Sequence, residues 1–469
     1  MASGARAGAE PERRRAWLIG LALFCCYGYF FYLGGNWNVE SRSAQIFALA
    51  EHGSLVIDDY PFLPEGGGDA AHYRGHFYSD KLIGPSLVSA PIYWIARRSL
   101  TAWGMGFRLA VYVALRITNI IVNGIPSALI GVLLYLFLVE LGLSAQLRVW
   151  LALAYGLGTL ALPYSTAFFG HQFAAACVIA SFLLLWRQRQ GWSPARGMAA
   201  GALAGLAAIS DVMGLVVAVF LGFYAIRVAA RALQGKTVGL GSIAQRVGLF
   251  ALPAAVVFGL QLAANWSSFG SAFTMPHIYH AQQTFRARHT AGLFGIHLPQ
   301  LYPLYQLTVG PWRGIFYSSP VLILAVPGLF LLSRRWRAEA AFIAAAWLAV
   351  VLLNSGYENW TTGSSFGPRY QLAAIPLLMV AAAPAARRWP ALFKCLAVIS
   401  IAFMAAVTAQ SPFVPEDARN PLATALAGFA RGDLLHGNAG RLVGLPGLLS
   451  LLPLAVLEAA CLCGIRRAK

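Results

Sequence analysis

Apolar stretches recur along the whole chain, and this is the feature that most restricts its fold. A helix needs about 20 apolar residues to cross a bilayer core about 30 Å thick. Of the 469 residues, 58% are hydrophobic and only 11% are charged, whereas soluble domains are about a quarter charged. The sequence therefore predicts an all-α integral membrane protein, in which residues 1–469 form one polytopic domain of about twelve transmembrane helices. The predicted spans are 17–33, 109–138, 147–165, 172–186, 197–209, 212–226, 247–264, 315–333, 338–353, 371–384, 391–409 and 442–464.

Basic residues lie in short clusters between these stretches. The clusters are "ERRR" at 12–15, "RQRQ" at 187–190, "RRWR" at 334–337, "RR" at 387–388 and "RRAK" at the end. Such clusters are typical of cytoplasmic loops. We therefore expect a multi-pass protein of the inner (cytoplasmic) membrane with both termini in the cytoplasm. The net charge of +18 does not indicate nucleic-acid binding, because no basic stretch is interleaved with aromatic residues.

Three large loops then lie outside the membrane. They are 34–108, 265–314 and 410–441. In this topology positions 65 and 290 are outside and position 235 is inside. The segment 82–96 is ambiguous, since it is apolar but short and holds two prolines. Counting it as a span would place the later basic clusters outside, so we expect a helix at the outer membrane surface; a true short span is the alternative.

Acidic residues gather in the first outer loop. Seven of the 17 Asp and Glu residues fall between positions 36 and 81. Solvated loops attract acids without any catalytic role, but this does not explain why the other loops hold so few. Glu40 follows the first span closely, and a carboxylate at the membrane surface can act as general base for an incoming hydroxyl. Asp58 and Asp59 can do the same if the loop folds back.

The stretch "HYRGHFYSDKLIGPS" at 72–86 supplies further reactive side chains. Lys81 can hold a lipid phosphate as a point charge, and His76 is a candidate for contact with substrate. Two carboxylates with a histidine can hold a divalent metal ion, and Asp80 is a candidate ligand. Together these are the parts needed to transfer a group from a lipid phosphate at the membrane surface.

Two segments of this loop resemble a known pattern. "NVESRSAQIFALAEHGSLVIDDY" and "GHFYSDKLIGPSLVSAPIYW" resemble the first extracytoplasmic loop of the GT-C superfamily of integral membrane glycosyltransferases. The likeness is greatest to the aminoarabinose transferase and protein O-mannosyltransferase branch. That branch has Asp-Glu-x-Arg-Tyr-Ala after the first helix, then a Gly-Asp-Trp turn, then Tyr-x-x-Lys-Pro-Pro before an apolar segment. Here "VESRSA", "HGSLVI" and "YSDKLIGPS" take these places in the same order.

The resemblance implies a GT-C-like bundle with juxtamembrane helices in the first extracytoplasmic loop. It also implies roles for four residues. Glu40 falls on the Glu of the Asp-Glu pair, and Arg42 falls on the arginine two residues later. Lys81 falls on the lysine that contacts the lipid-linked phosphate, and Asp80 falls on the acidic residue beside that lysine.

One departure from the pattern concerns the catalytic residue. The position of the family's catalytic Asp is Val39 here, and valine cannot take a proton. Either Glu40 takes over as base, or one of Asp58, Asp59 and Asp69 does, or the chain has lost activity.

Two later polar stretches contribute further candidates. "YSTAFFGHQF" at 164–173 resembles the family's second outer loop, with His171 where an Asp begins a helix. An imidazole there can coordinate a cation together with Asp80 or bind a phosphate, or it can simply cap the helix. In "NSGYENWTTGSSFGPRY" at 354–370, Arg369 suits bidentate contact with a phosphate, and Tyr357 and Trp360 suit stacking on a sugar. The alternative is a loop of interfacial aromatic residues with a snorkelling arginine.

Three functions remain open at this point. The favoured one is an inverting glycosyltransferase that uses a polyprenyl-phosphate-linked sugar donor at the outer face, with a lipid, glycan or protein hydroxyl as acceptor. A membrane transporter or lipid flippase is the alternative, and it predicts paired ionisable residues inside the spans, where Arg116 is the clearest case. The third is an inactive partner protein, because of Val39. A divalent metal ion is the one cofactor that we consider.

Overall fold

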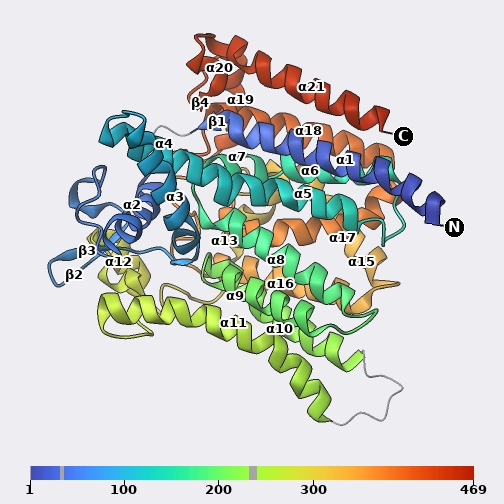
Figure 1. The fold of residues 1–469 in the computed structure, drawn as a ribbon, viewed down its shortest axis with the longest axis horizontal. Coiled ribbons are helices and arrows are strands. Elements are labelled where there is room, and N and C mark those ends of the chain that lie inside the picture. Colours follow the sequence, from blue (N-terminus) through green and yellow to red (C-terminus); the bar gives the residue numbers. More distant parts are fainter. Residues whose placement is uncertain (1, 32–35, 232–239, 469) are drawn as a thin grey trace.

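A bundle of long helices carries a smaller group of short elements at one end (Figure 1). The computed structural model describes residues 2–31, 36–231 and 240–468. The bundle is formed by α1 (Ala2–Tyr29), α4 (Phe107–Asn119), η2 (Ile120–Gly124), α5 (Ile125–Phe137), α6 (Ala145–Gly158), α7 (Ala161–Thr166), α8 (Gly170–Arg187), α9 (Pro194–Ala208), α10 (Val212–Arg231), α11 (Leu240–Phe269), η4 (Pro320–Leu324), α15 (Ala325–Ser333), α16 (Arg337–Ser355), η5 (Arg369–Ala374), α17 (Ile375–Arg388), α18 (Pro390–Gln410), η6 (Gly447–Leu451) and α21 (Leu452–Arg467).

The remaining elements connect the bundle helices. They are β1 (Phe30–Phe31), α2 (Trp37–His52), η1 (Glu65–Gly67), β2 (Ala70–Tyr73), β3 (His76–Ser79), α3 (Gly84–Ala102), η3 (Pro276–Tyr279), α12 (Gln283–Thr290), α13 (Leu301–Thr308), α14 (Ile315–Ser318), α19 (Pro421–Arg431), β4 (Gly437–Asn438) and α20 (Ala439–Leu442). The strands form two antiparallel pairs, β1 with β4 and β2 with β3. Sheet is therefore a minor component, and the predicted all-α membrane fold is confirmed.

Eight helices among the described residues are long and apolar enough to cross a membrane. They cover eight of the twelve predicted spans. The other four fall on α1 with β1, on α6 with α7, on α9, and on α14, η4 and α15. Positions 32 and 33 of the first predicted span lie outside the described residues. At 1.5 Å per residue, the 14 residues of α6 and the 15 of α9 are short for a 30 Å core.

The segment 34–108, which the sequence predicts to be the first outer loop, contains the predicted helices. Asn36 caps α2, its side-chain oxygen accepting hydrogen bonds from the amides of Asn38 and Val39, and Gly53 ends the helix in the left-handed conformation. The ambiguous segment 82–96 lies within α3, which packs against α2 and α4 and is not among the membrane-length apolar helices. Positions 34 and 35 of the predicted loop lie outside the described residues.

The basic clusters lie together at the end of the bundle where α1 begins and α21 ends (Figure 1). Contacts between these helix ends show this: Arg148 lies 3.0 Å from Glu12, and Arg189 lies 3.1 Å from Glu339. The group of α2, β2, β3 and α12 lies at the opposite end. This separation is what the charge pattern predicts. Position 235, expected inside, lies outside the described residues.

Arg116 in α4 donates hydrogen bonds to the backbone carbonyls of Phe30 and Thr166. Its partners are therefore backbone groups at the ends of neighbouring helices, and no carboxylate among the described residues pairs with it.

Candidate active site

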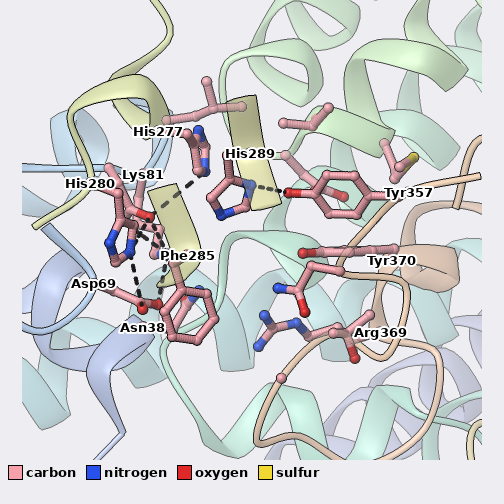
Figure 2. A pocket seen from close by; sticks show the side chains of 18 of the residues that line it. Asn38, Asp69, Lys81, His277, His280, Phe285, His289, Tyr357, Arg369 and Tyr370 are labelled. Carbon is pink, nitrogen blue, oxygen red and sulfur yellow. Dashed lines mark hydrogen bonds and ion pairs between the residues drawn. The ribbon is translucent and has the colours of Figure 1, made fainter. Parts of the chain in front are cut away.

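A cavity of about 410 Å³ lies between the bundle and the first outer loop, within the size range of ligand sites. Its walls come from α2, from the stretch 69–82, from the starts of α8 and α10, from 275–296, and from 353–370. Figure 2 shows that side chains from these separate segments point into one space.

One side of the cavity holds a lysine between two aspartates. Lys81 Nζ lies 2.9 Å from Asp69 Oδ2 and 2.9 Å from Asp80 Oδ1. Burial would raise the pKa of Asp69, but the Lys81 ammonium and a hydrogen bond from His280 outweigh it and hold that pKa well below its usual range. Burial would lower the pKa of Lys81, but the two carboxylates outweigh it and raise that pKa. Asp69 and Lys81 are therefore both charged at neutral pH.

The β2–β3 hairpin positions this group. Its turn places Arg74 and Gly75 at positive φ, 50° and 84°, as a two-residue hairpin turn requires. Ser79 at the end of β3 shares a 2.8 Å hydrogen bond with Ser41 of α2, and its hydroxyl also accepts from the amide of Lys81 at 3.2 Å. The hairpin is thereby fixed to α2, and the residues after it face the cavity.

Two arginines line the other side of the cavity. Arg42 is 5% exposed and Arg369 is 8% exposed, and neither makes an ion pair with a carboxylate among the described residues. Nη1 of Arg42 and Nε of Arg369 are buried without a hydrogen-bond partner. Burial lowers the pKa of Arg42 to about 10, which leaves it charged. Buried cations without a paired anion are costly, so these two arginines are suited to an anionic ligand.

Arg313 holds the loop that precedes Arg369. It is 1% exposed and donates to the backbone carbonyls of Thr361 at 2.7 Å and Ser365 at 2.6 Å. The loop forms part of the cavity wall. Arg313 therefore has a structural role and leaves Arg369 to face the cavity.

His171 and Asp211 form a second polar contact near the arginines. His171 Nδ1 lies 3.1 Å from Asp211 Oδ1, and both side chains are buried. A Cβ on the preceding Gly170 would lie 2.3 Å from the carbonyl oxygen of Ser210. Only glycine allows the starts of α8 and α10 to approach so closely, and this approach brings the pair together.

Three histidines from the segment 265–314, His277, His280 and His289, line the cavity. His277 Nε2 lies 3.7 Å from Asp80, and the rings of His277 and His289 are 4.6 Å apart. Nδ1 of His289 shares a 2.7 Å hydrogen bond with the hydroxyl of Tyr357 (Figure 2). Burial, together with the neighbouring His277 and His280, lowers the pKa of His289 to about 3. His289 is therefore neutral at neutral pH.

The structure brings together six of the predicted site residues. The cavity is lined by Arg42, Asp80, Lys81, His171, Tyr357 and Arg369. Lys81 and Arg369, which are far apart in the sequence, thus line one cavity. Lys81, however, is held by two carboxylates, whereas Arg369 is not.

The other five predicted residues do not line the cavity. Glu40 is on a different face of α2, where it accepts a 3.0 Å hydrogen bond from Tyr60. Asp58 accepts from His76 Nδ1 at 2.7 Å, away from the cavity, and the Asp59 side chain is 82% exposed. Trp360 packs against Trp312 with ring centroids 5.0 Å apart. These residues share the loops of the site but not its interior.

The proposed metal ligands are also separated. Asp80 contacts Lys81 and His277, whereas His171 contacts Asp211. No group of three or more His, Cys, Asp or Glu side chains in the described part of the chain has the geometry to hold a metal ion. Because the Lys81 ammonium already lies between Asp69 and Asp80, these residues do not fit a divalent cation.

Sequence reasoning missed several residues of the cavity. They are Asn38, Asp211, His277, His280, His289 and Tyr370. Asp69, one of the alternative bases that the sequence suggests, also lines the cavity. Two features of the sequence could have pointed to these acids. Three consecutive glycines precede Asp69, and Asp211 lies between two apolar stretches.

The sequence matches no protein-family model and no protein of curated function. Among solved structures, the chain is similar to ArnT from Cupriavidus metallidurans bound to undecaprenyl phosphate, at 15% identity and a TM-score of 0.48, over 97% of this chain and 75% of that one. It is also similar to the arabinosyltransferase EmbB from Mycobacterium smegmatis, at 14% identity and a TM-score of 0.48, over 97% of this chain and 41% of that one. Both are GT-C glycosyltransferases, the superfamily that the first-loop motifs resemble, and at these scores the similarity is a likeness and does not assign the chain to the family of either protein.

Proposed function

We propose that this protein is a glycosyltransferase that takes a sugar from a polyprenyl phosphate at the outer face of the membrane. The observation that carries the proposal is the division of charge inside one cavity. Two buried arginines without carboxylate partners lie on one side, and a carboxylate pair that shares a single lysine lies on the other.

The arginine side is the proposed phosphate site. A guanidinium binds phosphate oxygens through two parallel hydrogen bonds, which are about twice as strong as neutral ones. Nη1 of Arg42 and Nε of Arg369 lack partners, so an anion there would satisfy groups that are otherwise buried unpaired. Lys81 is less suited to this role than the resemblance implies, because both aspartates already bind its ammonium.

The position of the cavity fits a substrate that is anchored in lipid. The cavity forms where the starts of α8 and α10 meet the first outer loop, at the end of the bundle opposite the basic clusters. A sugar tethered by its lipid phosphate stays near the membrane surface, so its reacting carbon can reach such a site. The ArnT structure contains bound undecaprenyl phosphate, which is a lipid of this class.

The proposed reaction is a direct displacement at the anomeric carbon. The acceptor is a hydroxyl of a lipid, glycan or protein, and its oxygen attacks from the carboxylate side. Polyprenyl phosphate leaves toward Arg42 and Arg369, which stabilise its charge. A single displacement of this kind inverts the configuration of the anomeric carbon.

Binding of undecaprenyl phosphate to the purified protein in nanodiscs, followed by native mass spectrometry, tests the phosphate site. Arg42→Gln and Arg369→Gln should each weaken binding about 10- to 150-fold, as expected for the loss of a charged hydrogen bond. Arg98→Gln is the matched control, because Arg98 is an exposed arginine in the same predicted outer loop as Arg42 and lies outside the cavity. Absence of binding to the wild type, or equal losses in all three variants, would contradict the proposal.

The outer-face assignment has its own test. In a chain without its six native cysteines, a cysteine at exposed position 65 or 290 should react with an impermeant reagent in intact cells, and one at exposed position 190 should not. Labelling only at position 190 would place the cavity on the cytoplasmic side.

A further inference from the structure

Asp69 is the most accessible carboxylate of the cavity. Its side chain is 19% exposed, compared with 2% for Asp80 and 4% for Asp211. Figure 2 shows Asp69 beside Lys81 and His280, across the cavity from Arg369. It therefore faces the space between the proposed phosphate site and the opposite wall.

The chain before Asp69 is shaped to place it there. Gly66, Gly67 and Gly68 all have positive φ, at 68°, 83° and 59°. A Cβ on Gly67 would lie 2.5 Å from the ring of Phe77, and one on Gly68 would lie 3.0 Å from Pro64. Both conformation and space thus require glycine in the stretch "GGGD". A turn that needs three consecutive glycines indicates that the position of Asp69 is specifically determined.

Contacts keep Asp69 ionised and oriented. Its Oδ2 accepts a hydrogen bond from Lys81 Nζ at 2.9 Å, and its Oδ1 lies 3.8 Å from His280 Nε2. Nδ1 of His280 accepts from the amide of Gln282 at 3.1 Å, so the ring proton resides on Nε2, the nitrogen that faces Asp69. An ionised carboxylate is the form that can accept a proton.

The other acidic side chains near the site either contact other groups or lie outside the cavity. Both oxygens of Asp80 contact Lys81, and Ser41 also donates to one of them. Asp211 contacts His171 on the arginine side, where the leaving phosphate would lie. Glu40 does not line the cavity.

We propose that Asp69 is the general base that deprotonates the acceptor hydroxyl. This inference rests on the proposed function. The hydroxyl proton passes to a carboxylate oxygen of Asp69 while the acceptor oxygen forms its bond to the anomeric carbon. The bond from that carbon to the phosphate oxygen breaks, and its electron pair leaves with polyprenyl phosphate, whose charge Arg42 and Arg369 stabilise.

Asp69 does not need to be a strong base for this step. Glycosyl transfer passes through an oxocarbenium-like transition state, in which the bond to the leaving group is largely broken. The acceptor hydroxyl becomes acidic only as its oxygen joins the electron-poor carbon. Placement and ionisation of the carboxylate then matter more than its affinity for protons.

Two variants and a rescue experiment test the assignment. Asp69→Ala and Asp69→Asn should each lower the rate of sugar transfer about 100- to 10,000-fold, while binding of undecaprenyl phosphate stays within about twofold of wild type. Formate should restore part of the transfer in Asp69→Ala, because the small carboxylate fits the space that is left, and should not do so in Asp69→Asn. Asp417→Ala, at an exposed acid outside the cavity, should transfer at the wild-type rate.

The outcomes separate this inference from the function on which it rests. Transfer by wild type together with near-normal transfer by both Asp69 variants would overturn the inference alone. Loss of transfer in Asp69→Ala without rescue by formate, accompanied by weaker binding of undecaprenyl phosphate, would make Asp69 a structural residue and also overturn it. Wild type that binds the lipid but transfers no sugar would end the proposed function and this inference together.

Discussion

The ammonium of Lys81 lies 2.9 Å from a carboxylate oxygen of Asp69, a residue twelve positions earlier in the chain. The same nitrogen lies 2.9 Å from Asp80. One lysine thus lies between two carboxyl groups that face the cavity. This contact changes the role of Lys81, which the family resemblance places against the donor phosphate.

Lys81→Met should destabilise the protein by about 3 kcal/mol, because removal of one partner leaves buried carboxylates without compensation. The raised pKa of Lys81 gives stability that is present below its unfolded pKa of about 10.4 and is lost as pH rises through the folded pKa. The lowered pKa of Asp69 gives stability that is present above about 3.9 and is lost as pH falls through the folded pKa. Thermal unfolding should therefore show that Lys81→Met is less stable than wild type by a nearly constant amount between about pH 5 and pH 9. A variant as stable as wild type at pH 7 would show that the contact does not form.

His289→Gln should flatten the decline in stability toward acid pH. Burial and its neighbours lower the pKa of His289 to about 3, so the unfolded chain, with a pKa of about 6.5, takes up the proton first. Folded wild type therefore loses stability as pH falls below about 6.5. The facing groups are His277, His280, Lys81 and Asp69.

Unfolding temperatures between pH 7.5 and pH 4.5 check this prediction. His72→Gln is the control, because His72 is exposed and does not line the cavity. Parallel curves for wild type and His289→Gln would show that His289 is not buried in its neutral form.

Gly170→Ala should separate His171 from Asp211. The added methyl would lie 2.3 Å from the Ser210 carbonyl oxygen and 3.2 Å from Arg42 Nη1, so the starts of α8 and α10 must move apart. Overpacking of this kind costs about 1–3 kcal/mol, and we expect weaker lipid-phosphate binding as well. Gly191→Ala is the matched control, since a Cβ there meets open space. Wild-type stability and binding in Gly170→Ala would mean that the helix ends are not packed so closely.

Glu40→Gln should retain most of the transfer activity. Glu40 accepts a hydrogen bond from Tyr60 and does not line the cavity, although the resemblance places it beside the family's catalytic residue. Sugar transfer by membranes that contain equal amounts of wild type and variant checks this. A loss of about 100-fold or more, with lipid binding intact, would return the role of base to Glu40.

Hydropathy and charge were sufficient to predict the helical membrane fold. The thickness of the bilayer sets the length of each apolar segment, and the basic clusters indicate which loops share one side of the membrane. The helices of the first loop were also predicted. Which side chains face the cavity could not be predicted, because the direction of a side chain on a helix depends on the position of its residue in the turn. Arg42 faces the cavity and Glu40, two residues earlier, does not.

The histidines were missed for a different reason. His277, His280 and His289 lie about 200 residues after Asp80 in the sequence, and no local pattern links them to the first loop. The backbone contact that joins them is the bond from the amide of Ala281 to the carbonyl of Ala70, at 2.8 Å. Such a pairing between distant segments appears only in the folded structure.

The most direct measurement of the central claim is turnover in proteoliposomes with a polyprenyl-phosphate sugar labelled with ¹³C at its anomeric carbon, in the presence of a cell-envelope fraction that supplies acceptors. Wild type should release polyprenyl phosphate and form a glycoside whose anomeric configuration, read by NMR, is opposite to that of the donor, and Arg369→Gln should do neither. Movement of intact donor across the membrane with no release of polyprenyl phosphate would contradict the account and favour a transporter.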